Sequence, residues 1–271
     1  MRIALAQTTT GIDPAAEATR LAALVAEAAA RGADMLFTPE MSGLLDRDRR
    51  RAATHITDEA HDPALAAVRA AAAEHGLWVH LGSLALKGEG EKYVNQGYLV
   101  RPDGSVAARY AKIHLFDVEL GSESWRESAA YAPGVEAVLA QTPWGGLGLS
   151  VCYDLRFPAL YRALAQAGAA MLSVPAAFTR PTGRAHWHVL LRARAIETGC
   201  FVIAAAQTGE HQDGRATWGH SLIVSPWGEV LLDMGEAPGL AVLDVDVAEV
   251  EAVRARLPSL AHDRPFKLVR A

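Results

Sequence analysis

Cys152 occupies a position in the chain that suits a nucleophile. The residues before it, 146–151, alternate small and branched apolar types after a Pro-Trp-Gly-Gly turn, which is typical of a short buried strand. Phe157-Pro158 then begins a helix that we expect to run to Gly168. A thiol at such a strand end lies at the rim of a sheet, where backbone N–H groups and a helix start favour negative charge. The alternative is that Cys152 is a small buried core residue.

Two charged side chains elsewhere in the chain could complete a site for acyl transfer. Glu40 follows an expected strand, 35–37, and Pro39, so its carboxylate leaves a sheet at the same kind of rim. Lys112 begins an apolar run that ends at Phe116. Alone, Glu40 would be interpreted as a surface end cap, and Lys112 would be consistent with a snorkelling side chain. Together with the thiol they supply a nucleophile, a base and a positive charge for an oxyanion, and this combination predicts acyl transfer.

The elements that must position these residues alternate between strands and helices. Strands are predicted at 3–7, 35–37, 77–81, 93–100, 105–110, 136–141, 146–151, 171–174, 201–206, 221–224, 229–233 and 240–245. Helices are predicted from the N-cap Asp13 to the stop at Gly32, from Asp62 to Gly76, and over 157–168, 184–198 and 247–256, with an irregular segment at 112–134. Strands that are apolar throughout and helices that are apolar on one face predict buried sheets covered by helices. Because no linker or internal repeat interrupts the pattern, we expect a single domain over 1–271.

Composition excludes several classes of protein. Of 271 residues, 51% are hydrophobic and 21% charged, which is typical of a globular protein. The net charge is −5, and the one short basic cluster, 47–51, is expected to be a solvated face, so nucleic-acid binding is not expected. No stretch of about 18 apolar residues could span a membrane, and the first residues do not resemble a signal peptide, so we expect a cytoplasmic protein.

Metal and cofactor sites are not expected either. The two cysteines lie far apart in the sequence, and Cys200 is expected in the core. His186 and His188 are two positions apart on a predicted helix, which directs them to different faces. The Gly-rich stretch at 146–148 lacks the third glycine of a dinucleotide-binding loop. We therefore expect no metal and no organic cofactor.

Three segments, 37–40, 110–115 and 152–158, resemble the signatures of the nitrilase or carbon-nitrogen hydrolase superfamily. The resemblance extends over nearly the whole chain, including 175–178, 185–187, 191–197 and 219–221. It implies an α/β fold of the αββα sandwich type, in which two stacked mixed sheets are flanked by helices. It also implies that the three residues singled out above form a Glu-Lys-Cys triad.

The resemblance further implies a role for each residue of the site. Cys152 is expected to attack an amide carbonyl carbon, and Glu40 to take the thiol proton, return a proton to the leaving amine and activate water. Lys112 and the backbone N–H of Tyr153 are expected to hold the oxyanion. Glu127 matches a further glutamate that orients the lysine or the substrate; without the resemblance it would pass for a solvated loop residue.

Within the superfamily the sequence looks like amidases that act on amides of short dicarboxylic keto acids. The resemblance favours an amide with a dipeptide leaving group, and a simple monoamide is the alternative. Arg156 suits a substrate carboxylate, and the alternative is an ion pair with Asp154 or with a carboxylate at a helix start. Phe178 and Thr182 are expected to line the pocket, although Phe178 would also suit the core. The resemblance implies a homodimer, and the alternatives from other classes are a non-catalytic binding module and a true nitrilase.

Overall fold

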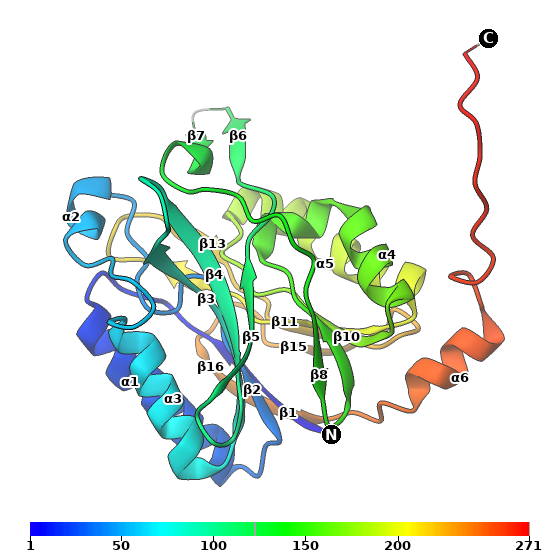
Figure 1. Ribbon diagram of the computed structural model, residues 1–271, viewed down its shortest axis with the longest axis horizontal. Helices are drawn as coiled ribbons and strands as arrows, with labels where there is room; N and C mark the ends of the chain where they lie inside the picture. The colour runs from blue at the N-terminus through cyan, green and yellow to red at the C-terminus, as the bar shows by residue number, and fades with distance from the viewer. Residues whose placement is uncertain (122, 271) are drawn as a thin grey trace.

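Two six-stranded sheets lie face to face between layers of helices in the computed structural model, which describes residues 1–121 and 123–270 (Figure 1). In the first sheet β1, β2 and β3 run parallel, and β16 and β4 pair antiparallel with the outer two. The order across this sheet is β16 (Gly239–Asp244), β1 (Arg2–Gln7), β2 (Met35–Phe37), β3 (Trp78–Lys87), β4 (Tyr93–Val100) and β5 (Val106–Ala111).

The second sheet has the same mixed character, with β9, β10 and β11 parallel and antiparallel strands at both sides. Its order is β15 (Val230–Asp233), β14 (Leu222–Val224), β11 (Phe201–Ala204), β10 (Ala169–Ser173), β9 (Gly145–Gly148) and β8 (Leu139–Thr142). The predicted sandwich of two mixed sheets is thus confirmed.

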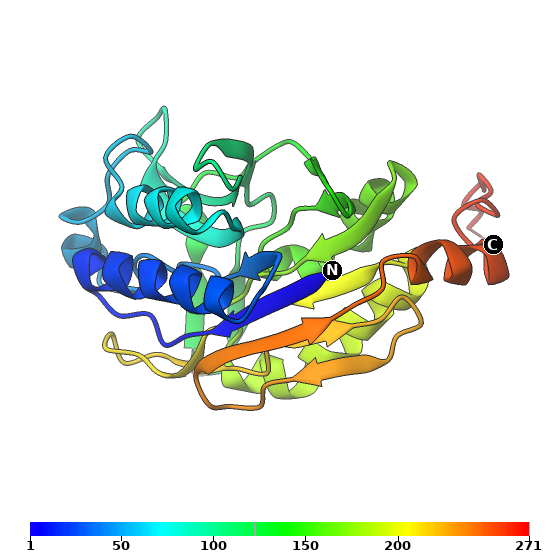
Figure 2. The ribbon, with the colours of Figure 1, turned by 90° about the horizontal axis from the view of Figure 1, so that it is seen from below.

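Helices cover the outer faces of both sheets. Helices α1 (Pro14–Ala30) and α3 (Pro63–His75) lie side by side on the first sheet (Figure 2). Helices α4 (Pro158–Gln166) and α5 (Arg180–Thr198) pack on the second. Two shorter helices, α2 (Arg49–Ala53) and α6 (Glu249–Arg256), lie outside this arrangement, and the C-terminal segment beyond α6 extends away from the body (Figure 1).

Strand β1 shows how the sequence builds the two interior layers. Successive side chains of a strand point to opposite faces. Ile3 and Leu5 accordingly join the core between the sheets, whereas Ala4 and Ala6 pack toward α1 and α3. Small residues on the outer face let the helices approach the sheet closely.

The strand directions bring the site residues to one edge. Strand β5 pairs antiparallel with β4, and β4 with β3, so β5 ends at the same edge as β2. Glu40 follows β2 and Lys112 follows β5, so the fold gathers them although 72 positions separate them.

Most predicted elements are present, and the helix caps explain why. The side chains of Asp13 and Asp62 accept backbone N–H groups at the starts of α1 and α3, and Gly76 ends α3 at φ 64°, in the left-handed region. Helix α5 begins at Arg180 rather than 184, because proline fits the first turn of a helix. Gly183 within that turn leaves room for Trp218, since a Cβ there would lie 2.2 Å from Trp218 Cγ.

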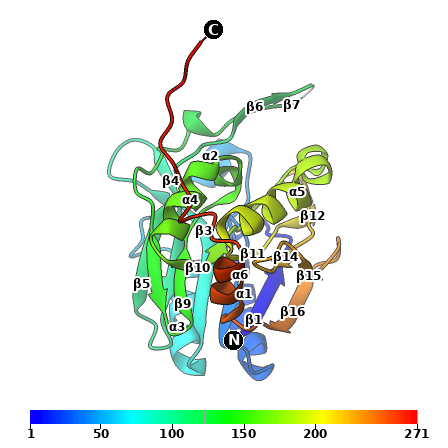
Figure 3. The same ribbon diagram turned by 90° about the vertical axis from the view of Figure 1, so that its right-hand side faces the viewer.

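The prediction of an irregular segment at 112–134 is wrong. It contains a hairpin of β6 (Asp117–Leu120) and β7 (Glu123–Arg126), followed by a short 3₁₀ turn (Glu127–Ala129), and the hairpin projects from the body (Figure 3). A second hairpin, β12 (Thr208–Glu210) and β13 (Ala216–Trp218), was also missed. These strands are short and contain polar residues, so no apolar run marks them, unlike the equally short but wholly apolar β2 and β14.

Candidate active site

Cys152 lies at a strained turn between β9 and a short 3₁₀ helix (Cys152–Arg156). Its φ is 50°, in the left-handed region that a residue with a side chain rarely adopts. Its backbone N–H donates to Pro175 O at 2.8 Å, and Arg194 donates twice to Leu155 O, at 3.0 and 2.7 Å. These contacts hold the turn, and the thiol is 7% exposed.

Asp154 fastens this turn to the segment that carries Lys112. Its fully buried carboxylate accepts hydrogen bonds from Tyr110 Oη at 2.7 Å and Val151 N at 2.9 Å. It also accepts from His114 N at 2.9 Å and meets His114 Nδ1 at 2.7 Å. The ion pair between Arg156 and Asp154 that the sequence left open is therefore wrong, because other donors occupy Asp154.

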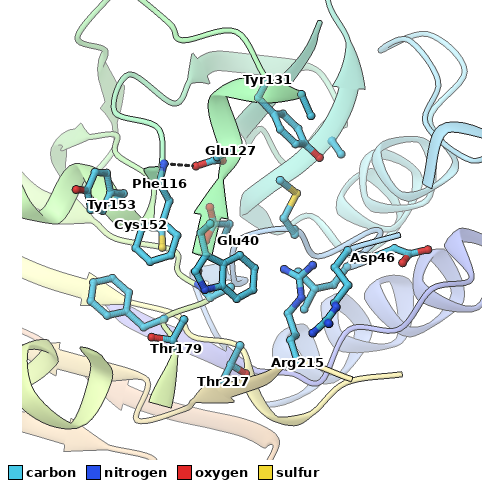
Figure 4. A pocket seen from close by; sticks show the side chains of 18 of the residues that line it. Glu40, Asp46, Phe116, Glu127, Tyr131, Cys152, Tyr153, Thr179, Arg215 and Thr217 are labelled. Carbon is cyan, nitrogen blue, oxygen red and sulfur yellow. Dashed lines mark hydrogen bonds between the residues drawn. The ribbon is translucent and has the colours of Figure 1, made fainter. Parts of the chain in front are cut away.

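Lys112 is buried between two carboxylates. Its Nζ donates to Glu40 Oε1 at 2.9 Å and to both oxygens of Glu127, at 3.0 and 2.9 Å. Glu127 Oε2 also accepts from Phe116 N at 2.6 Å (Figure 4). Glu127, which the sequence alone would leave as a solvated loop residue, thus belongs to the buried cluster.

Glu40 is held by a neighbour on β4 of the first sheet and by neighbours in the segments that follow β10 and β11 of the second. Its Oε1 accepts from Asn95 Nδ2 at 2.9 Å, and its Oε2 accepts from Ala177 N at 2.9 Å. Gln207 Nε2 donates to its backbone oxygen at 2.9 Å. At 4% exposure the carboxylate is fixed and shielded from water.

Asn95 is a residue of the cluster that sequence reasoning missed. It lies on β4 and donates to Glu40 and to Glu127 Oε1, the latter at 3.2 Å. Its own Oδ1 is buried and accepts no hydrogen bond from residues 1–121 or 123–270. A polar pair, Asn95-Gln96, inside the expected strand 93–100 was the available signal.

The electrostatics assign a resting state to the cluster. Burial raises the pKa of Glu40, but Lys112 and hydrogen bonds from Cys152 and Asn95 outweigh it, so that pKa lies below its ordinary value. Burial lowers the pKa of Lys112, but Glu127 and Glu40 raise it well above the usual range. Burial and the charge of Glu40 raise the pKa of the Cys152 thiol. At neutral pH the cluster therefore holds a carboxylate, an ammonium and a neutral thiol.

A cavity of about 730 Å³ opens beside these groups (Figure 4). Its wall includes Glu40, Lys112, Glu127 and Cys152 together with three further predicted residues, Tyr153, Phe178 and Thr182. Arg156 is not part of the wall. Its guanidinium carbon lies 5.8 and 5.5 Å from the ring centroids of Tyr153 and Phe178, and its Nη1 lies 3.3 Å from His186 Nδ1.

One group of residues outside the cavity has metal-ligand chemistry. In the described part of the chain, ligand atoms of His188, His220 and Asp233 lie within 4.8 Å of one another. Asp233 already forms hydrogen bonds with His188 at 3.0 Å and His220 at 2.9 Å, which accounts for the grouping.

No helix within residues 1–121 and 123–270 is both long and apolar enough to cross a bilayer.

A thiol beside a buried carboxylate and ammonium, at the rim of an αββα sandwich, defines a cysteine-dependent amidase. A sequence profile of the family described as carbon-nitrogen hydrolase matches residues 2–255. The chain therefore belongs to the carbon-nitrogen hydrolase family.

Relatives with assigned names agree with this class. The human protein named deaminated glutathione amidase is 42% identical over 97% of this chain and 82% of its own length. A protein of the same name from Synechocystis is 50% identical over 65% of each chain.

Solved structures share the fold. The C. elegans NitFhit protein has a TM-score of 0.88 at 35% identity over 97% of this chain, which spans 65% of the NitFhit chain. An amidase from Nesterenkonia sp. AN1, solved with acrylamide added to its active-site cysteine, has a TM-score of 0.80 at 31% identity, covering 95% and 98% of the two chains.

Proposed function

We propose that this enzyme hydrolyses deaminated glutathione to 2-oxoglutarate and cysteinylglycine, a metabolite-repair reaction. The observation that supports it most is the thiol of Cys152 beside a buried Glu40–Lys112 pair in a cavity of about 730 Å³. The names of relatives 39–50% identical to this chain support the choice of substrate.

In the acylation step, Cys152 Sγ attacks the carbonyl carbon of the amide and its proton passes to Glu40. The oxygen that becomes negative is held by Lys112 Nζ and the backbone N–H of Tyr153. As the tetrahedral intermediate collapses, the C–N bond breaks and Glu40 returns the proton to the leaving nitrogen. The products are the free amine and a thioester on Cys152.

In the deacylation step, Glu40 takes a proton from water, and the oxygen of that water attacks the thioester carbon. The C–S bond breaks, the sulfur regains its proton from Glu40, and the acid is released. The lowered pKa of Glu40 suits a group that is ionised at the start of both steps. Lys112 does not suit the role of base, because its raised pKa keeps it protonated.

The other predicted residues have supporting roles in this proposal. Glu127 positions Lys112, since it accepts two of the hydrogen bonds that the ammonium donates. Phe178 and Thr182, both on the cavity wall, contact the substrate. Arg156 stays a predicted carboxylate ligand, with its guanidinium over the rings of two wall residues.

Steady-state kinetics with purified enzyme test the substrate. Deaminated glutathione and 2-oxoglutaramate share the acyl group and differ in the leaving group, so the ratio of their kcat/KM values isolates the preference. We expect deaminated glutathione to be the better substrate. A higher kcat/KM for 2-oxoglutaramate would instead identify an omega-amidase, ammonia release from nitriles a nitrilase, and failure of every amide to acylate Cys152 a non-catalytic module.

We also propose a single domain that forms a cytoplasmic homodimer. Exposed apolar side chains support an assembly: Val189 on α5 is 68% exposed, and Phe266 and Leu268 in the C-terminal segment are 91% and 82% exposed. Both cysteines are free thiols, which fits a reducing compartment. Light scattering of the protein as it elutes from a size-exclusion column would measure the mass of the assembly. A monomer mass would contradict the proposed homodimer.

A further inference from the structure

The cavity wall carries an excess of positive charge, although the whole chain has a net charge of −5. Apart from the catalytic cluster, its charged residues are one carboxylate, Asp46, and five arginines: Arg47, Arg49, Arg126, Arg180 and Arg215. Asp46 is already bound by Arg51, at 2.7 and 2.8 Å. The short basic cluster that the sequence assigned to a solvated face thus contributes two arginines to this wall. Such a wall favours an anionic ligand.

Arg215 is the arginine best held for binding. Its side chain is 18% exposed, against 48% for Arg180 and 66% for Arg126. Its Nε donates to Asp213 Oδ2 at 2.7 Å, and its guanidinium carbon lies 5.5 Å from the ring centroid of Trp125. These contacts fix the plane of the guanidinium.

Asp213 anchors this arrangement across two loops. Its side chain is fully covered and accepts from Arg215 N at 3.0 Å and from Arg47 N at 2.8 Å. Only the Nε of the Arg215 guanidinium is engaged by a hydrogen bond to the residues described. The two Nη groups remain as a fork that matches the two oxygens of a carboxylate.

The position of Arg215 relates it to one end of the substrate. Arg215 lies across the pocket from Cys152 and Tyr153 (Figure 4). Deaminated glutathione has a carboxylate on each side of the scissile amide. The acyl-side carboxylate is joined to the scissile carbon by a short chain, whereas the leaving-group carboxylate ends a dipeptide and reaches further from the sulfur.

Building on the proposed function, we infer that Arg215 binds the carboxylate of the leaving dipeptide and thereby selects substrates whose amine portion ends in a carboxylate. The acyl portion and the thioester formed from it do not depend on this contact. Loss of Arg215 therefore weakens turnover only of amides that carry the distal carboxylate.

Two substrates and one variant test this. In Arg215→Gln, kcat/KM for deaminated glutathione falls about 10-fold to 100-fold, mainly through KM, as expected for loss of hydrogen bonds to a charged group. With 2-oxoglutaramate, which lacks a leaving-group carboxylate, kcat/KM changes by less than about twofold because that contact is not made. Arg31→Gln, directly after α1, removes the same charge from an exposed site outside the cavity and leaves both values unchanged.

The outcomes separate this inference from the proposed function. Equal losses on both substrates, or no loss on either, overturn the role of Arg215 while the wild-type activity stands. A wild-type enzyme inactive on deaminated glutathione overturns the proposed function and this role with it. If Arg215→Gln fails to fold because Asp213 loses its partner, the double variant Arg215→Gln, Asp213→Asn removes both charges and gives the same two-substrate comparison.

Discussion

Lys112 Nζ lies 2.9 Å from Glu40 Oε1 and 2.9 Å from Glu127 Oε2, so two buried carboxylates share one buried cation. The ammonium of Lys112 keeps the carboxylate of Glu40 ionised in this buried site, next to the neutral thiol of Cys152. Glu40 can therefore accept the proton when the sulfur attacks.

Glu40→Gln is expected to lower kcat by about 10²-fold to 10⁴-fold, because the variant has no base at this position. Lys112 retains its pair with Glu127, so we expect the variant to stay folded. Measurement of kcat together with thermal unfolding checks both points. A variant that keeps kcat within a few-fold of wild type would exclude Glu40 as the base.

Lys112→Met is expected to reduce the free energy of unfolding by about 3–5 kcal/mol, because Glu40 and Glu127 are left buried without a cation. The double variant Lys112→Met, Glu127→Gln removes one of those carboxylates and should recover part of the stability without recovering activity. Urea unfolding curves of the three proteins give the comparison. If the single variant is as stable as wild type, the buried ion pairs do not hold this part of the fold.

Asp154→Asn tests the link between the Cys152 turn and the Lys112 segment. Each oxygen of the Asp154 carboxylate accepts from two donors. An amide NH₂ in place of either oxygen would therefore place donor against donor, and hydrogen bonds would be lost. We expect a loss of about 1–3 kcal/mol in unfolding free energy. We also expect lower kcat with little change in KM, because Asp154 positions the nucleophile and does not line the cavity. A change in KM alone would show that the turn stays in place without it.

The pH dependence of activity follows from the direction of the pKa shifts. Activity is lost on acidification when Glu40 takes a proton. Because the pKa of Glu40 lies below the ordinary 4.5, kcat/KM should stay high as the pH falls to 4.5. The pKa of Cys152 lies well above the ordinary 9.0, so no loss from thiol ionisation is expected below pH 9. A rate profile with an acidic limb near neutral pH would contradict this assignment.

Stability should show a matching plateau. The pKa of Glu40 is lowered on folding, so its contribution is present above pH 4.5 and is lost as pH falls through the folded value. The pKa of Lys112 is raised, so its contribution is present below pH 10.5 and is lost as pH rises through the folded value. The difference between the unfolding midpoints of wild type and Lys112→Met, measured across this pH range, gives the contribution of Lys112 to stability and shows where it is lost.

Local signals in the sequence predicted most of the fold. Asp13 and Asp62 at helix starts, and glycines at helix ends, are effects of neighbouring residues, so they are visible without tertiary structure. The hairpins β6–β7 and β12–β13 were missed because their short strands contain polar residues and so form no apolar run.

The site was harder to predict than the fold. Residue type and position singled out Glu40, Lys112 and Cys152, and the resemblance to a family added Glu127. The contacts between them, however, join distant positions. Asn95 and Asp154 act through hydrogen bonds to residues 32 to 55 positions away, which no local pattern encodes. The five arginines of the cavity wall likewise come from segments that are distant in the sequence and meet only in the folded chain.

Intact-protein mass spectrometry of enzyme quenched during turnover of deaminated glutathione tests the central claim most directly. The account predicts a mass increase equal to one 2-oxoglutaryl group, located on Cys152 by peptide mapping and absent from Cys152→Ala, which should also be inactive. An acyl group on another residue, or turnover by Cys152→Ala, would contradict it.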